Sequence, residues 1–314
     1  QCIEHANTLD IRALVLKTEG KHLSAGADLN WFVNDAGVTG TVDQVLLEQL
    51  PTGTAQGIVS DYFDDGVTNG GAYSSDDFTL AADTTIDGFF FDGFTNGTNL
   101  ADEITSFTVM VYPDNAGVPD GHPEDGGSTE LLNVTLPVGD YRLNLTDGLG
   151  ALYVNVTDSI GSALELTAGT YWVVAYANFT GANRWNWLTG VGTGTVAKLV
   201  DPTGIFGVAS PDWLIISDLV GDVDFDGLAF NAHTLVGCGA PWMSVNAPAG
   251  LIIPGDDEDL TVTLDSTGLA PGVYTAPLCI DSDDPDEGVV IVDVTLTVEQ
   301  CDLIFANGFE APAP

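Results

Sequence analysis

The sequence predicts an all-β protein made of two antiparallel β-sandwich modules. Apolar and polar residues alternate in short runs such as 107–112 and 171–176, which is the pattern of strands with one buried face. Clusters of Gly, Asn, Asp and Pro, such as residues 113–117, separate these runs as turns do. Thr-rich strands, short spacing and few helix formers favour a sandwich or a jelly roll.

The chain changes character near residue 40. Residues 1–40 contain five acidic and three basic residues, whereas the remainder contains 41 acidic and only three basic residues. We therefore predict four parts: residues 1–50, a first β-sandwich module at 51–236, a second at 237–299 and a tail at 300–314. Hydrophobic residues make up 45% of the chain, which is enough for each module to build a core.

The formal net charge of −40 limits the partners of the protein. Such a surface repels nucleic-acid phosphates and anionic membranes, so we expect neither as a partner. No run approaches the ~20 apolar residues that a membrane span needs, and no membrane insertion is expected. The N-terminus has no signal-peptide pattern. Since the chain starts at Gln1, we interpret it as a processed product or a fragment.

The first part of the chain contains a recognisable motif. Residues 11–17 form a short apolar run of strand character, and residues 23–31 follow with the sequence Ala-Gly-Ala-Asp at their centre. Together they closely resemble the enoyl-CoA hydratase (crotonase) family, in which such a strand leads into a helix. The resemblance implies that the backbone N–H of Ala27 is one of two donors that hold a thioester enolate oxygen.

The remainder of a crotonase site is not evident in the sequence. In that family the second donor comes from a Gly-rich turn with catalytic glutamates nearby. Gly70 and Gly71 lie at a suitable distance along the chain, but residues 72–77 contain no Glu. We therefore interpret residues 1–50 as a non-functional remnant and linker, and a working enoyl-CoA hydratase or isomerase is the alternative.

The first module shows a succession of strands. Residues 75–80 open it, residues 107–121 and 166–179 follow, and residues 226–230 form the expected closing strand. This order resembles β-sandwich modules of bacterial secreted proteins, and the resemblance implies no catalytic residues.

The second module has the clearer pattern. Residues 260–264 place Leu260, Val262 and Leu264 on one inward face, and residues 289–298 alternate to close the sheet. The stretch from residue 241 to 298 resembles the immunoglobulin-like repeats of bacterial extracellular proteases, glycosidases and adhesins. Residues 301–310 resemble a short ending found on many secreted proteins of gamma-proteobacteria.

Four cysteines permit three pairings, among Cys2, Cys238, Cys279 and Cys301. We favour Cys238–Cys279 because both residues fall in the second module, and free buried thiols are the alternative. No Cys-x-x-Cys or Cys/His pattern is present, so we do not expect zinc.

Alternating carboxylates suggest a calcium site. Asp222, Asp224 and Asp226 precede a Gly, as in the first half of a calcium loop. The twelfth position of such a loop is His233 here, in place of the usual Glu. The alternative is an acidic strand edge.

Two tryptophans suggest a sugar-binding surface. Trp185 and Trp187 lie two residues apart and share one face of a strand. With Tyr171 or Tyr176 they could form an aromatic platform that stacks on sugar rings. The alternative is that these rings belong to the core, where large aromatic residues usually lie.

Taken together, these features predict a secreted, non-enzymatic protein that acts as an accessory, adhesion or spacer module. Calcium is the candidate cofactor, and a polysaccharide or cell-surface component is the candidate partner. No Gly-x-Ser-x-Gly elbow is present in the long acidic region. Besides the hydratase alternative, the chain could be the C-terminal accessory region of a secreted protease.

Overall fold

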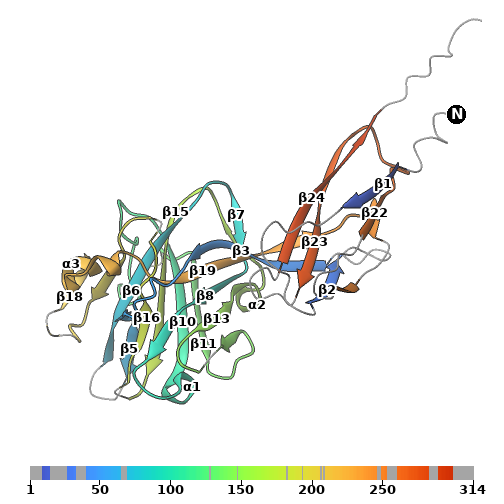
Figure 1. Cartoon of the computed structure of the whole chain (residues 1–314). Coiled ribbons are helices and arrows are strands. Elements are labelled where there is room, and N and C mark those ends of the chain that lie inside the picture. Colours follow the sequence, from blue (N-terminus) through green and yellow to red (C-terminus); the bar gives the residue numbers. More distant parts are fainter. Residues whose placement is uncertain are drawn as a thin grey trace, which may run out of the picture. The chain divides into compact units, whose positions relative to one another are not determined.

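The computed structural model defines most of the chain. It describes residues 9–14, 27–32, 40–64, 69–126, 129–146, 148–181, 183–192, 194–205, 207, 209–245, 249–252, 260–282 and 289–299. Within these ranges lie strands β1–β24, three short helices and one 3-10 turn (Figure 1). The all-β class predicted from the sequence is confirmed.

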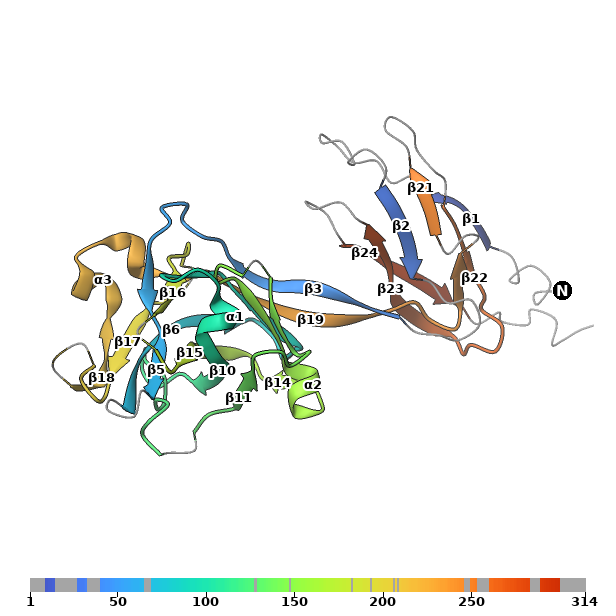
Figure 2. The same cartoon turned by 90° about the horizontal axis from the view of Figure 1, so that it is seen from below.

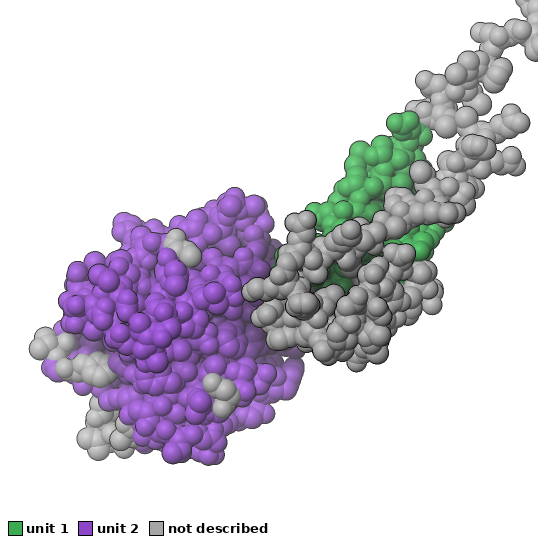
Figure 3. All heavy atoms as spheres, in the orientation of Figure 1, with its two compact units in different colours: residues 1–44, 236–314 green, residues 45–235 purple. Residues whose placement is uncertain are grey.

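The chain forms two compact units, and the larger unit is inserted within the sequence of the smaller one. Unit 2 contains residues 45–235, whereas unit 1 combines residues 1–44 with residues 236–314 (Figure 3). The chain passes from unit 1 into unit 2 along β3 (Gly40–Gln49) and returns along β19 (Phe230–Cys238). These two strands are neighbours in one sheet (Figure 2).

The main sheet of unit 2 has seven strands. In spatial order they are β11 (Leu132–Pro137), β10 (Ile104–Pro113), β15 (Gly169–Phe179), β5 (Asp61–Asp64), β6 (Asn69–Leu80), β17 (Lys198–Asp201) and β18 (Ser210–Ile215). Strands β15 and β5 are parallel, while the other neighbours pair in the antiparallel direction.

A five-stranded sheet accompanies it, with the order β12 (Leu143–Leu145), β13 (Leu152–Asn155), β8 (Gly88–Phe91), β19 and β3. Two small sheets contain β4 (Gly57–Val59), β16 (Trp185–Leu188) and β9 (Gly93–Thr95), and β14 (Leu164–Leu166) with β7 (Thr84–Ile86). The helical segments are α1 (Leu100–Glu103), α2 (Val156–Ile160), α3 (Ile216–Val220) and the 3-10 turn η1 (Val223–Asp226).

One hydrophobic core draws side chains from both large sheets. Phe107 and Val109 of β10 lie in it with Val173 of β15, and Phe91 and Phe230 join them from the five-stranded sheet. All five side chains are fully buried. The period-two pattern read from the sequence therefore corresponds to inward-facing positions on β10 and β15.

The opposite face of the seven-stranded sheet is also covered. Its side chains form what we call the outer aromatic cluster, which consists of Tyr73, Met110, Tyr112, Trp172, Val174 and Val200, with Tyr62, Tyr176 and Trp213 packed against it. The loop after β10 is bound to this face, because Trp172 Nε1 donates to Asp114 Oδ1 at 2.8 Å. Both faces of β10 and β15 are therefore buried, where the sequence pattern predicted only one.

Unit 1 contains two further sheets. Their spatial orders are β1 (Leu9–Leu14), β22 (Leu260–Leu264) and β20 (Met243–Val245), and β21 (Ala249–Ile252), β2 (Ala27–Phe32), β23 (Gly272–Ser282) and β24 (Val289–Val298). Leu260, Val262 and Leu264 are buried as predicted, in a core that also contains Trp242 and Leu278.

The N-terminal segment differs from what the crotonase resemblance implies. Residues 27–32 form strand β2 and not a helix. Strand β1 pairs with β22, and β2 lies between β21 and β23. A six-residue helix has little intrinsic stability, whereas a neighbouring strand offers unpaired backbone groups to a passing segment. Strands β1 and β2 therefore belong to unit 1, whereas the sequence predicts a separate part at residues 1–50.

This pairing makes a deletion of residues 1–39 informative. We expect the truncated protein to melt about 5 °C or more lower in its unit 1 transition, because β22 and β23 lose strand partners. Differential scanning calorimetry measures this shift. The unit 1 transition is identified as the one whose midpoint changes when the Cys238–Cys279 disulfide is reduced. Deletion of residues 1–8, which precede β1, is the control. An unchanged unit 1 transition in the longer deletion would favour the remnant interpretation.

Candidate functional site

Trp185 and Trp187, predicted to form an aromatic platform on the surface, lie in the core. The predicted sugar-binding surface is therefore wrong, and the alternative, that these rings belong to the core, is confirmed. Trp185 and Trp187 are fully buried on β16, and Tyr171 is 8% exposed. The indole of Trp185 packs edge-on against Phe107 at 5.0 Å between ring centroids, and Trp187 packs against Phe91 at 5.2 Å. Their Nε1 atoms donate to the carbonyl oxygens of Gly150 and Ala229, respectively. No ring face is left for a sugar.

The predicted calcium ligands are not brought together. Asp222 is the N-cap of η1, and its Oδ1 accepts a hydrogen bond from the Asp224 N–H at 3.0 Å. Throughout the described ranges, no group of three or more His, Cys, Asp or Glu side chains is arranged to hold a metal ion.

The predicted oxyanion donors do not form a described site either. Ala27 begins β2, where it pairs with Ile252. The N–H of Gly71, in the Gly-Gly pair considered as a second donor, donates to Glu124 Oε1 at 2.8 Å. That amide therefore already has a partner within unit 2.

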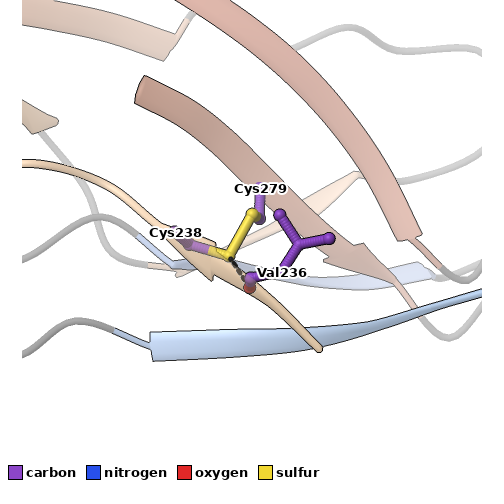
Figure 4. The surroundings of a disulfide bond; sticks show 3 residues. All are labelled: Val236, Cys238 and Cys279. Atoms are coloured by element: carbon purple, nitrogen blue, oxygen red, sulfur yellow. Dashed lines mark hydrogen bonds between the residues drawn. A yellow bond between two sulfur atoms is a disulfide. The ribbon is translucent and has the colours of Figure 1, made fainter. Parts of the chain in front are cut away.

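The disulfide favoured from the sequence is present. Cys238 at the end of β19 and Cys279 in β23 are joined with a Cα–Cα distance of 5.6 Å, and both are buried (Figure 4). Val236 packs beside the bridge, and its carbonyl oxygen lies 3.4 Å from the Cys238 Sγ. Cys2, Cys301 and the whole tail at 300–314 lie outside the described residues.

Two fully buried carboxylates hold strands together. Asp76 accepts hydrogen bonds from the N–H groups of Asp77 and Leu228, at 2.9 and 2.7 Å. Asp61 accepts from the Trp185 N–H at 3.0 Å. Burial raises the pKa of both carboxyls, and the hydrogen bonds from the backbone oppose this shift. The N–H groups of Leu228 and Trp185 belong to segments distant in sequence, so Asp76 joins β6 to the segment at Leu228, and Asp61 joins β5 to β16.

An open groove lies beside the outer aromatic cluster. It has a volume of about 350 Å³ and is lined by Val118, Pro119, Gly121, His122, Pro211, Asp212 and Trp213. We call it the Trp213 groove. Its lining comes from the loop after β10 and from the start of β18, which are about ninety residues apart in sequence. Sequence reasoning missed this site because local patterns carry no information about such a juxtaposition.

Another groove lies at the β7–β14 pair. It has a volume of about 560 Å³ and is lined by Asp83, Thr84, Thr85, Glu165, Leu166 and Thr167. Hydroxyls and two carboxylates dominate this lining, and none of these side chains is aromatic.

Comparison with protein-family models, with curated proteins and with solved structures finds no match to this chain. Among the helices that the structure describes, none has the length and apolar character needed to cross a bilayer.

Proposed function

We propose that this chain is an exported, non-catalytic β protein that serves as an attachment or spacer module. The observation that carries the proposal is the buried Cys238–Cys279 disulfide. Disulfides form and persist in oxidising environments outside the cytosol, while thiols of cytosolic proteins are usually kept reduced. The two all-β units, one of which contains this bridge, suit a module that presents a surface.

The charge of the chain supports the same proposal and restricts the partner. A formal charge of −40 favours solubility and is tolerated best where salt screens it. The same charge disfavours polyanionic partners. A neutral polymer or a cell-surface component with little negative charge therefore fits best.

The state of the two cysteines tests the proposal. Protein directed to an oxidising compartment should show no alkylation of Cys238 and Cys279 without reductant. The double variant Cys238→Ser/Cys279→Ser should lose about 4 kcal/mol of stability in unit 1, because the bridge closes a loop with a sequence separation of 41. Mass spectrometry after alkylation and chemical denaturation measure these effects.

Two results would contradict the proposal. The first is that both thiols are freely alkylated in protein from the oxidising compartment, with the double variant as stable as the parent. The second is a higher melting temperature in the presence of an acyl-CoA, which would favour the hydratase alternative.

A further inference from the structure

We infer that the Trp213 groove binds a sugar ring of a neutral polysaccharide. This inference rests on the proposed attachment function and names the ligand class of that module. It also moves sugar binding from Trp185 and Trp187, which are buried, to a tryptophan that lines an open groove.

The indole of Trp213 is held in place before any ligand arrives. Its ring packs against the outer aromatic cluster, and its Nε1 donates to the Gly121 carbonyl oxygen at 2.9 Å. Gly121 has a φ of +132°, a conformation that side-chain-bearing residues rarely adopt. Because the ring is already ordered, binding a ligand on it costs little side-chain entropy.

The loop that forms the other wall is anchored as well. Glu124 Oε1 accepts hydrogen bonds from the Tyr73 hydroxyl at 2.7 Å and from the Gly71 N–H at 2.8 Å, which fixes the loop to β6. Pro119 and Pro211 add two rigid apolar rings to the lining. The groove is therefore largely pre-formed, as small-ligand sites usually are.

The lining also contains two polar side chains. His122 Nδ1 accepts a hydrogen bond from the Glu124 N–H at 3.2 Å, so Nε2 is the ring nitrogen that donates. The exposed carboxylate of Asp212 supplies acceptors. A groove that combines an indole with a donor and an acceptor suits a ring that has apolar C–H faces and hydroxyls at its rim.

The charge near the groove selects among sugars. Asp212 lines it, and Glu124 and Asp125 lie in the loop that forms its wall. In a chain of formal charge −40, these carboxylates repel uronate and sulfate groups. A neutral sugar is therefore the ligand. The β7–β14 groove is not the site, because its lining has two carboxylates and no aromatic ring on which a sugar could stack.

Affinity electrophoresis of the full chain tests this assignment. The probes are gels containing hydroxyethyl cellulose, xyloglucan, mixed-linkage β-glucan, galactomannan or soluble starch, and pull-down on chitin, with alginate as the anionic probe. We expect retardation by at least one neutral polymer and none by alginate. Trp213→Ala should weaken that binding at least tenfold, while Trp213→Phe, which keeps a ring, should weaken it less.

Controls separate binding from folding. Thr84→Ala in the β7–β14 groove should bind like the parent. Because Trp213→Ala also removes packing against the outer aromatic cluster, the double variant His122→Ala/Asp212→Ala, which leaves the platform intact, should independently weaken binding several-fold at an unchanged melting temperature.

The inference is overturned if no neutral polymer is bound, if alginate is bound most tightly, or if both the Trp213→Ala and the double variant bind like the parent. These outcomes are distinct from failure of the proposed function. Absence of sugar binding leaves the thiol result untouched, and free thiols leave sugar binding untouched.

Discussion

Trp187→Ala is expected to destabilise unit 2 by about 3–5 kcal/mol, as is usual when a large aromatic side chain is removed from a core. The side chain is fully buried, contacts Phe91 and Phe230, and donates to the Ala229 carbonyl oxygen at 2.7 Å. The variant leaves a cavity and removes one of the two hydrogen bonds that the Ala229 carbonyl oxygen accepts, the other coming from the Asp92 N–H at 3.2 Å. Guanidinium or urea denaturation followed by circular dichroism measures the loss.

Tyr141→Ala is the matched control, because that ring is 81% exposed and its removal should change stability by no more than about 0.5 kcal/mol. A Trp187→Ala protein that keeps full stability but loses polysaccharide binding would mean that the indole belongs to a surface platform after all.

Asp76→Ala is expected to cost about 2–5 kcal/mol, because it leaves the buried N–H groups of Asp77 and Leu228 without an acceptor. Asp76→Asn keeps the size of the side chain but replaces one acceptor by an NH₂ group, so it should also destabilise the protein. Equal stability of the parent and Asp76→Ala at pH 7 would show that the hydrogen bond from the Leu228 N–H does not hold β6 to that segment.

The same residue should give unit 2 a distinctive pH dependence. Burial raises the pKa of Asp76 in the folded state, so the folded protein retains this proton to a higher pH than the unfolded chain does. Its contribution is fully present below the unfolded pKa of about 3.9 and is lost as the pH rises through the folded pKa. Asp76→Asn should therefore reduce the decline of stability with rising pH. Part of this decline should remain in the variant, because burial also raises the pKa of Asp61.

Asp140 provides a control of opposite sign. Its hydrogen bonds with Arg142 lower the pKa of this partly buried carboxyl to about 2. The contribution of Asp140 is therefore present above the unfolded pKa and is lost as the pH falls towards 2. Asp140→Asn should therefore be less stable than the parent above the unfolded pKa, and this difference should vanish as the pH falls towards 2. An Asp76→Asn profile parallel to that of the parent from pH 4 upwards would contradict the role assigned to Asp76.

The sequence predicted the strands better than their surroundings. Alternation placed Trp185 and Trp187 on one face of a strand, and both do lie in the same core, 6.1 Å apart between ring centroids. Period two cannot tell whether a shared face looks towards the core or towards water. Here the choice depends on packing against Phe91 and Phe107, which come from strands distant in sequence.

Contacts between segments distant in sequence also explain why the pairing of β1 and β2 and the Trp213 groove were not predicted. Nothing in residues 9–14 or 27–32 indicates that β22 and β23 are their partners, because backbone ladders are not specific for side chains. The segment at Asp222–Asp226 is a local exception, because the hydrogen bond from the Asp224 N–H to Asp222 Oδ1 that caps η1 joins residues only two apart. The Trp213 groove could not be predicted, because it depends on the contact of Trp213 with the Gly121 carbonyl oxygen, which forms only when the loop is folded.

The insertion of one unit into the sequence of the other has a mechanical consequence for the attachment role that we propose. Both flanking stretches of the chain, residues 1–44 and 236–314, belong to unit 1, while unit 2 is entered along β3 and left along β19. Tension applied through the two stretches that flank residues 45–235 therefore loads the β1–β22 and β2–β23 ladders before it can stretch those residues. Unit 2 does not bear this load until the strands of unit 1 separate, so its fold is preserved under a pulling force that strains unit 1.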